Sequence, residues 1–155
     1  MYKIMFVCHG NICRSPMAEF IFKNMLVEQG LSYKYEVSSS ATSNEEISGG
    51  VGNPVYPPAR AELKKHGIEC GGKRAVQLKK SDYDKYDLFI CMDSRNVVNA
   101  TRVLGGDPMV KVKKLMDYTS RGGDIADPWY TDRFDITYRD VFDGCRGLLM
   151  ALENK

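Results

Sequence analysis

The chain has 155 residues, 43% hydrophobic and 27% charged, which is typical of a soluble globular protein and predicts one domain over residues 1–155. Its 22 basic and 20 acidic side chains leave a net charge of +2, which excludes the strong field that binding to nucleic acid or a membrane surface requires. No apolar stretch approaches bilayer length, and the N-terminal apolar run ends early, so we expect neither a membrane anchor nor an export signal.

Five cysteines, at positions 8, 13, 70, 91 and 145, form an odd set without a paired Cys-x-x-Cys framework. This pattern favours reduced thiols and a cytoplasmic location over a disulfide-stapled secreted protein. A zinc site would require Cys8, His9 and Cys13 to find a fourth ligand among scattered residues, which does not fit the regular spacing of zinc ligands. We expect no metal and no other cofactor.

The first predicted element is a buried strand over Lys3–Val7, followed by the loop Cys8–Ser15 and a helix that opens at Pro16. Apolar residues recur at four-residue spacing along this helix until Gly30 ends it. A strand, a glycine-containing loop and a helix N-terminus together make an anion site, because unpaired N–H groups converge where the helix dipole is positive. The loop is therefore expected to bind a phosphate-like group.

The residue types in this loop indicate nucleophilic chemistry. Cys8 precedes Arg14 in a Cys-x5-Arg arrangement, and a cysteine beside a guanidinium and a helix N-terminus is expected to be the attacking thiolate. The fork of Arg14 can hold two phosphoryl oxygens at once, and the Ser15 hydroxyl can donate a hydrogen bond to the sulfur. Gly10 lets the backbone approach the ligand, and Asn11 tolerates a left-handed conformation that fixes the loop.

The middle of the chain predicts a second strand over Tyr33–Ser39 and then a long irregular loop over Ser40–Pro58, rich in glycine and proline. Pro57 and Pro58 can open a helix that ends at His66-Gly67. A short helical turn follows over Ser81–Tyr86.

In the C-terminal half, Leu88–Met92 predicts a strand, and Asp93-Ser94 caps a helix that runs to Leu104. Met109–Val112 predicts a weaker strand, and apolar spacing from Tyr138 to Leu152 predicts a long last helix. Strands alternating with helices indicate an α/β sandwich with one parallel sheet. Ligands of such folds bind at the carboxyl ends of the strands, which is where the Cys8 loop lies.

A candidate general acid lies before the last helix, in the stretch Asp127-Pro128-Trp129-Tyr130. A leaving oxygen needs a proton when a nucleophile displaces it from phosphorus. The proline biases Asp127 towards extended backbone, so its carboxyl can project from a loop.

The Cys8 loop resembles the signature Cys-x-Gly-Asn-x-Cys-Arg-Ser-Pro of the low-molecular-weight protein tyrosine phosphatase family. The matching residues are Cys8, Gly10, Asn11, Cys13, Arg14, Ser15 and Pro16. The resemblance covers nearly the whole chain and implies a three-layer sandwich with a four-stranded parallel sheet in flavodoxin-like order. It also implies that Asp127 is the acid, and that His9, Ile12 and the other loop residues bind the substrate.

The expected mechanism has two steps and needs no metal. Cys8 takes the phosphoryl group from a tyrosine-phosphorylated protein or a small aryl phosphate while Asp127 protonates the leaving oxygen. Water activated by Asp127 then hydrolyses the phosphocysteine and releases inorganic phosphate. Because Cys8 must be ionised while Asp127 is protonated, we expect the activity to be highest on the acid side of neutrality.

Several alternatives stay open. Trp129 and Tyr130 form a wall for an aromatic ring, as the resemblance implies, or Trp129 belongs to the core. Glu45 and Glu46 lie where family members often carry a bulky apolar residue at the rim, and they either disfavour acidic phosphopeptides or are solvated loop charges. Cys13 either forms a protective disulfide with Cys8 on oxidation, as in the family, or is a buried thiol.

Three rival functions are weaker. Arsenate reductase of this fold needs closely spaced further cysteines, and Cys70 and Cys91 are far apart. Protein arginine phosphatases resemble each other in having threonine at the position of Ile12, and an apolar residue there suits a phenyl ring better than a guanidinium. A non-catalytic phosphotyrosine-binding module would not need Cys8, Ser15 and Asp127 together.

Overall fold

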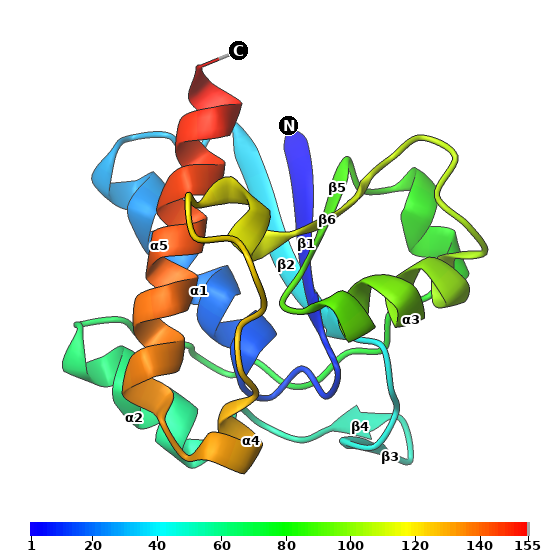
Figure 1. Cartoon of the computed structure of the whole chain (residues 1–155). Helices are drawn as coiled ribbons and strands as arrows, with labels where there is room; N and C mark the ends of the chain where they lie inside the picture. The colour runs from blue at the N-terminus through cyan, green and yellow to red at the C-terminus, as the bar shows by residue number, and fades with distance from the viewer. Residues whose placement is uncertain (155) are drawn as a thin grey trace.

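The computed structural model describes residues 1–154 and has a four-stranded parallel sheet at its centre (Figure 1). The strands are β1 (Tyr2–Cys8), β2 (Tyr35–Ala41), β5 (Leu88–Cys91) and β6 (Val112–Lys114), in the order β2-β1-β5-β6. Every neighbouring pair is parallel. The predicted α/β sandwich with a parallel sheet in flavodoxin-like order is confirmed.

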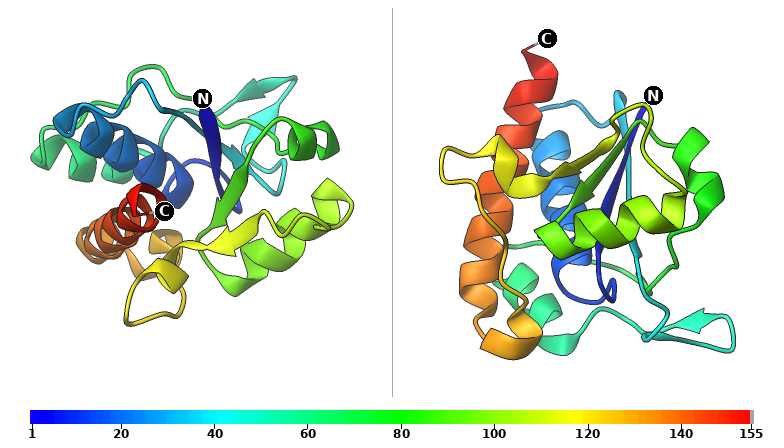
Figure 2. Two further views of the ribbon diagram at one scale, coloured as in Figure 1. Left: turned by 90° about the horizontal axis from the view of Figure 1, so that it is seen from above. Right: turned by 45° about the vertical axis from the view of Figure 1, so that its right-hand side comes forward.

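Helices cover both faces of the sheet and give the three layers seen in Figures 1 and 2. Helices α1 (Arg14–Glu28), α2 (Pro57–Lys65) and α5 (Phe134–Glu153) pack on one face, and α3 (Ser94–Leu104) packs on the other. The shorter elements are a hairpin of β3 (Ile47–Ser48) and β4 (Val51–Gly52), the 3-10 helices η1 (Lys80–Asp84) and η2 (Leu115–Tyr118), and α4 (Pro128–Thr131). Among residues 1–154, no helix is long and apolar enough to cross a membrane.

Strand β1 lies in the interior of the sheet and is buried on both faces. Ile4 and Phe6 belong to the apolar cluster under α1 and α5, whereas Met5 and Val7 belong to the cluster under α3. This alternation follows the two-residue period of a strand. The carboxyl end of β1, at the lower edge of the sheet in Figure 1, places Cys8 between β2 and β5, at the point where the strand order reverses.

Helix α1 begins at Arg14, two residues before the predicted start at Pro16. Pro16 is therefore its third residue, and it costs no helical hydrogen bond because N–H groups of the first turn have no partner within the helix. Strand β2 begins at Tyr35 rather than Tyr33 and continues to Ala41, which pairs with Cys8. The parallel pairing with β1 sets these bounds. The pattern of residues along β2 alone carries no information about that pairing.

The weaker strand predicted over Met109–Val112 is present, but its bounds were wrong, since β6 spans Val112–Lys114. The reason is Asp107, whose carboxylate accepts the backbone N–H groups of Lys111 at 2.7 Å and Val112 at 3.0 Å. These bonds fold the preceding residues into a tight loop, in which Met109 is 71% exposed. The same kind of contact shifts η1, because the Asp82 carboxylate accepts the N–H of Lys79, and η1 starts one residue before Ser81.

The long loop predicted over Ser40–Pro58 contains the β3–β4 hairpin. Its turn is Gly49-Gly50, and both glycines have positive φ, at 58° and 77°. Two residues with positive φ are what the commonest hairpin turn requires, and glycine adopts them without steric cost. The predicted helices that became α2, α3 and α5 are confirmed, with α2 ending before His66-Gly67.

Candidate active site

A cavity of about 370 Å³ opens at the carboxyl end of β1. It brings together residues from three distant segments: the loop after β1, the loop before β3 and the start of α4. The lining residues are Cys8, His9, Gly10, Asn11, Ile12, Cys13, Arg14, Glu45, Glu46, Asp127, Trp129 and Tyr130. Every site residue expected from the sequence lines this cavity except Ser15, which is fully buried and in contact with Cys8.

The sulfur of Cys8 lies among polar groups that suit a thiolate. Its Sγ atom is 3.0 Å from the Ser15 hydroxyl oxygen, and it accepts the backbone N–H of Asn11 at 3.3 Å. Helix α1 starts directly after its N-cap, Cys13. The Cys13 side chain accepts no hydrogen bond from the N–H groups of the first turn among the residues that the structure describes. The N–H groups of the first turn are thus left for an anion.

Asn11 sets the shape of the loop. Its φ of 58° is left-handed, as expected, and its amide Nδ2 donates to the hydroxyls of Ser15 at 2.8 Å and Ser39 at 2.9 Å. Its Oδ1 accepts the N–H of Val76 at 3.0 Å. One side chain therefore connects the loop to α1, to β2 and to the segment after α2.

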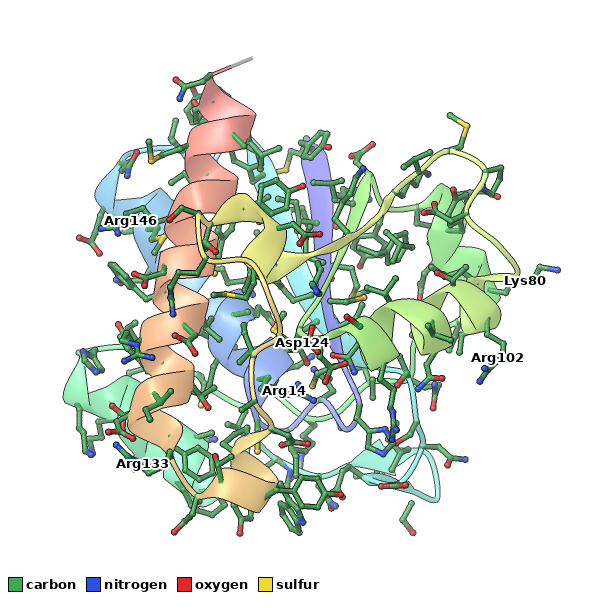
Figure 3. The ribbon with its side chains drawn as sticks, in the orientation of Figure 1. Arg14, Lys80, Arg102, Asp124, Arg133 and Arg146 are labelled. Carbon is green, nitrogen blue, oxygen red and sulfur yellow. The ribbon has the colours of Figure 1, made fainter. Side chains whose placement is uncertain are left out.

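Arg14, labelled in Figure 3, is almost fully buried beside the cavity, at 3% exposure, and two other segments of the chain contact its guanidinium. Nη1 donates to Asp93 Oδ2 at 2.7 Å and to the Ile125 carbonyl at 2.8 Å, and Nη2 lies 3.6 Å from Asp127 Oδ2. Burial alone would lower the pKa of Arg14, but the charges of Cys8, Asp93 and Asp127 outweigh it and raise the pKa. The guanidinium stays charged.

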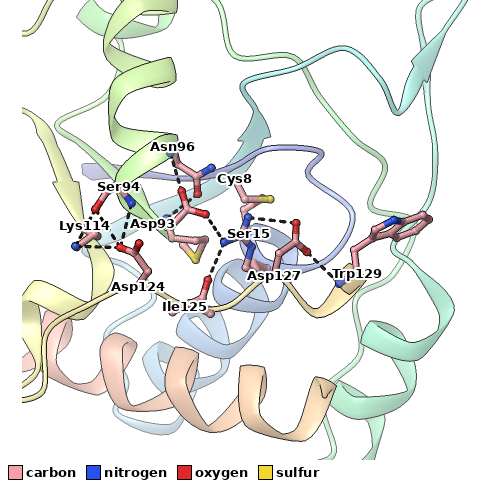
Figure 4. A network of polar contacts seen from close by, with 12 residues as sticks. Cys8, Ser15, Asp93, Ser94, Asn96, Lys114, Asp124, Ile125, Asp127 and Trp129 are labelled. Carbon is pink, nitrogen blue, oxygen red and sulfur yellow. Dashed lines mark hydrogen bonds and ion pairs between the residues drawn. The ribbon is translucent and has the colours of Figure 1, made fainter. Parts of the chain in front are cut away.

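Asp127 is the N-cap of α4, and its backbone is extended at φ −73° and ψ 114°, as the following proline predicts. One carboxylate oxygen accepts the N–H of Trp129 at 3.0 Å (Figure 4), and the other lies 3.6 Å from Arg14 Nη2. The cap holds the carboxyl at the cavity wall, on the same side as the guanidinium.

Aromatic and acidic side chains form opposite parts of the rim. Trp129 is 55% exposed and packs on Tyr56 with ring centroids 5.0 Å apart, so it is a wall of the cavity and not part of the core. Tyr130 is 84% exposed. On the opposite rim, Glu45 pairs with His9 at 3.0 Å, and the Glu46 side chain lies over the loop, so that a Cβ on Gly10 would be 3.2 Å from it.

The sequence analysis missed the second role of Asp93, which it treated as a helix cap. Asp93 does cap α3 by accepting the N–H of Asn96 at 2.7 Å, but its other oxygen binds Arg14. The signal was its place directly after a predicted strand of the parallel sheet, because ligands of such sheets bind at the carboxyl ends of the strands. Tyr56 was also missed, because nothing local links it to Trp129.

A buried polar network behind the loop was missed as well. The Ser39 hydroxyl donates to Glu19 at 2.6 Å, and Lys73 donates to the Ser39 carbonyl at 2.9 Å and lies 3.7 Å from Glu19. Burial lowers the pKa of Lys73 despite the nearby Glu19 carboxylate.

Burial, together with the charge of Cys8, raises the pKa of the Cys13 thiol. Within residues 1–154, no three His, Cys, Asp or Glu side chains group to hold a metal ion.

The chain is similar to known proteins over almost its whole length. The family profile described as low molecular weight phosphotyrosine protein phosphatase matches residues 3–155. The low molecular weight protein-tyrosine-phosphatase YfkJ of Bacillus subtilis is 33% identical over 100% of this chain and 98% of its own. Its crystal structure has a TM-score of 0.93, covering 99% and 96% of the two chains.

Two further relatives bear on the choice of substrate. The human low molecular weight phosphotyrosine protein phosphatase is 34% identical over 94% of this chain and 92% of its own. A structure of the YwlE arginine phosphatase is 26% identical with a TM-score of 0.83, covering 97% and 95% of the two chains; YwlE comes from Bacillus subtilis.

Proposed function

Since the chain belongs to the low molecular weight phosphotyrosine protein phosphatase family, we propose that Cys8 is its nucleophile, Arg14 its phosphate-binding cation and Asp127 its general acid and base. The enzymes of this family hydrolyse phosphotyrosine through a phosphocysteine intermediate. The observation that carries the residue assignment is the single cavity in which Cys8, Arg14 and Asp127 meet.

In the first step, the Cys8 sulfur attacks phosphorus and the bond to the tyrosine oxygen breaks. Arg14 and the N–H groups at the start of α1 stabilise the charge on the non-bridging oxygens. Asp127, protonated at this stage, gives its proton to the departing oxygen. Its position beside Arg14 keeps the carboxyl near the oxygens of the transferred group.

In the second step, Asp127 accepts a proton from water as the water attacks phosphorus, and the bond between sulfur and phosphorus breaks. Inorganic phosphate leaves, and Cys8 returns as the thiolate. The Ser15 hydroxyl, 3.0 Å from the sulfur, donates a hydrogen bond to that thiolate and so makes it a better leaving group.

The cavity walls favour an aromatic phosphate ester as the substrate. Trp129, packed at a tilt of 50° against Tyr56, offers an apolar face to a phenyl ring, and Ile12 lines the same cavity with an apolar side chain. We propose that a tyrosine-phosphorylated protein, or a small aryl phosphate, binds there, and that phosphoarginine is the poorer substrate because Ile12 offers its guanidinium no hydrogen bond.

The test uses one peptide sequence that carries phosphotyrosine, phosphoserine or phosphoarginine. The rate of hydrolysis of each peptide is measured for the wild type, Cys8→Ser and Asp127→Ala. We expect hydrolysis of phosphotyrosine with an optimum below pH 7, no turnover by Cys8→Ser, and a loss of about 100-fold or more for Asp127→Ala. Phosphoarginine hydrolysed faster than phosphotyrosine would overturn the substrate assignment. A rate that climbs steadily above neutrality would overturn the roles of Cys8 and Asp127.

A further inference from the structure

Asp124 lies three residues before Asp127, where the loop that carries the acid passes the start of α3 (Figure 4). One oxygen of its carboxylate accepts three hydrogen bonds: from the Ser94 backbone N–H at 3.1 Å, from the Ser94 hydroxyl at 3.1 Å and from Lys114 Nζ at 3.0 Å. Lys114 Nζ also donates to the Ser94 hydroxyl at 3.2 Å. We call Asp124, Ser94 and Lys114 the Asp124 clasp.

The surroundings of the clasp favour an ionised carboxylate. Ser94 is the first residue of α3, so its N–H has no helical partner and lies at the positive end of the helix dipole. The Lys114 side chain is only 18% exposed, and its ammonium would be a poorly solvated charge without Asp124. Burial alone would raise the pKa of Asp124, but the hydrogen bonds from Lys114 and Ser94 outweigh it and lower the pKa.

The clasp connects directly to the catalytic groups through the next residue. The Ile125 N–H donates to the Met92 carbonyl at 2.9 Å, at the end of β5, and the Ile125 carbonyl accepts from Arg14 at 2.8 Å. On the other side of Asp124 lie Gly122 and Gly123, both with positive φ and neither with a side chain to anchor the loop. Asp124 is thus the first side chain after these glycines that fixes the loop to the sheet layer.

We propose that Asp124 is a positioning residue for the general acid: the clasp holds residues 124–127 against the start of α3 and keeps the Asp127 carboxyl at the cavity beside Arg14. This inference rests on the proposed role of Asp127. Asp124 does not line the cavity, and it acts through the backbone of Ile125 and not on the substrate. Without the clasp the glycine-led loop samples other positions, and the acid spends less time in reach of the leaving oxygen.

A loosened acid has a specific kinetic signature. A good leaving group, such as 2,4-dinitrophenolate, departs without protonation, whereas phenolate needs a proton from Asp127. We therefore expect Asp124→Ala to lower kcat/KM about tenfold for phenyl phosphate and less than twofold for 2,4-dinitrophenyl phosphate. A purely structural defect, such as a smaller folded fraction, lowers both values by the same factor.

The experiment measures kcat/KM for a series of substituted phenyl phosphates with the wild type, Asp124→Ala, Asp124→Asn and Lys114→Met. Asp124→Asn keeps an oxygen for Ser94 but loses the charge, so its leaving-group dependence should fall between those of the wild type and Asp124→Ala. Asp117→Ala, which removes an exposed carboxylate from η2, is the matched control and should behave like the wild type. Asp127→Ala is the reference for complete loss of the acid.

A leaving-group dependence that steepens in Asp124→Ala, in the direction of Asp127→Ala, supports the inference. A uniform loss across the series, or no loss, overturns it while leaving the proposed function intact. If Asp124→Ala does not fold, Lys114→Met is judged by the same criterion. If Asp127→Ala itself shows no steeper dependence, the assignment of the acid is wrong, and this inference is overturned with it.

Discussion

Replacing Asn11 separates the shape of the phosphate loop from its chemistry, because this side chain takes no part in the proposed reaction. It makes three hydrogen bonds: two buried ones to the hydroxyls of Ser15 and Ser39, and a partly buried one from the N–H of Val76. Its backbone is left-handed at φ 58°, a conformation that alanine adopts with strain and glycine without it. Asn11→Ala removes the bonds and adds the strain, whereas Asn11→Gly removes only the bonds.

The three bonds set the size of the effect. At about 1 kcal/mol each they contribute about 3 kcal/mol to the free energy of unfolding. The left-handed alanine adds about 1 kcal/mol, which brings Asn11→Ala to a loss of about 4 kcal/mol. Glycine escapes that strain but gives a more flexible unfolded chain, so Asn11→Gly should be the more stable of the two variants by about 0.5 kcal/mol.

Urea unfolding followed by circular dichroism measures these differences in the free energy of unfolding. The value of kcat/KM for p-nitrophenyl phosphate shows whether the Cys8 loop keeps its shape. Both variants should lose about 100-fold in kcat/KM, since the N–H groups no longer converge on one phosphate position. Asn11→Ser is a useful comparison with Asn11→Ala because its hydroxyl can still donate or accept a hydrogen bond at this position. The reasoning is refuted if Asn11→Ala costs less than about 1 kcal/mol, or if Asn11→Gly is the less stable variant.

Three other changes test the electrostatics of the site and the core. Arg14→Lys should lower kcat/KM about 100-fold, because an ammonium cannot bind two phosphoryl oxygens as a fork, and steady-state assays showing less than a threefold loss would contradict this. Burial raises the pKa of Cys145 above its ordinary value of 9.0. The unfolded chain therefore loses this proton first, and stability present below pH 9.0 is lost at about 1.4 kcal/mol per pH unit above it. In urea unfolding between pH 9 and 10.5, Cys145→Ala should lack that part of the loss. Parallel plots of the free energy of unfolding against pH for the wild type and the variant would refute this. Replacing Glu45 and Glu46 by glutamine should raise kcat/KM about tenfold for phosphopeptides with acidic flanks at low salt and leave neutral ones unchanged, and the gain should fall as salt is added.

The parts of the fold that the sequence predicts are those with local causes. The β1 strand, the Asp93 cap and the stop at Gly30 each depend on residues within one turn or one strand, and all three are present. The start of β6 could not be predicted, because it depends on hydrogen bonds that the Asp107 carboxylate accepts from the N–H groups of residues that look like a strand in isolation. The β3–β4 hairpin had a usable signal in Gly49-Gly50, which was interpreted only as a break in regular structure.

The candidate site divides in the same way. The residues of the Cys8 loop are consecutive, so their spacing alone shows what they can bind. The partners of Arg14 are not: Asp93 and Ile125 lie 79 and 111 residues away and reach it only because β1 and β5 are neighbours in the sheet. The sequence pattern does not show which strands are neighbours in the sheet, and the Asp93 carboxylate was therefore interpreted only as a helix cap.

Arg14 shows why the phosphate site and the fold cannot be tuned separately. The guanidinium has a limited number of N–H donors, and Nη1 is already committed to Asp93 and to the Ile125 carbonyl. Only the remaining donors, on the side of Asp127, are free for phosphoryl oxygens. The bonds made by Nη1 fix the plane of the fork, so in the proposed mechanism the direction in which Arg14 binds phosphate is set by the residue after β5 and by the loop carrying Asp127. The Asp93 bond, at 2.7 Å, holds Nη1 independently of the loop, so a substitution that loosens only the loop should move the acid more than the guanidinium. Removing the Asp93 carboxylate should instead turn the guanidinium and slow good and poor leaving groups alike.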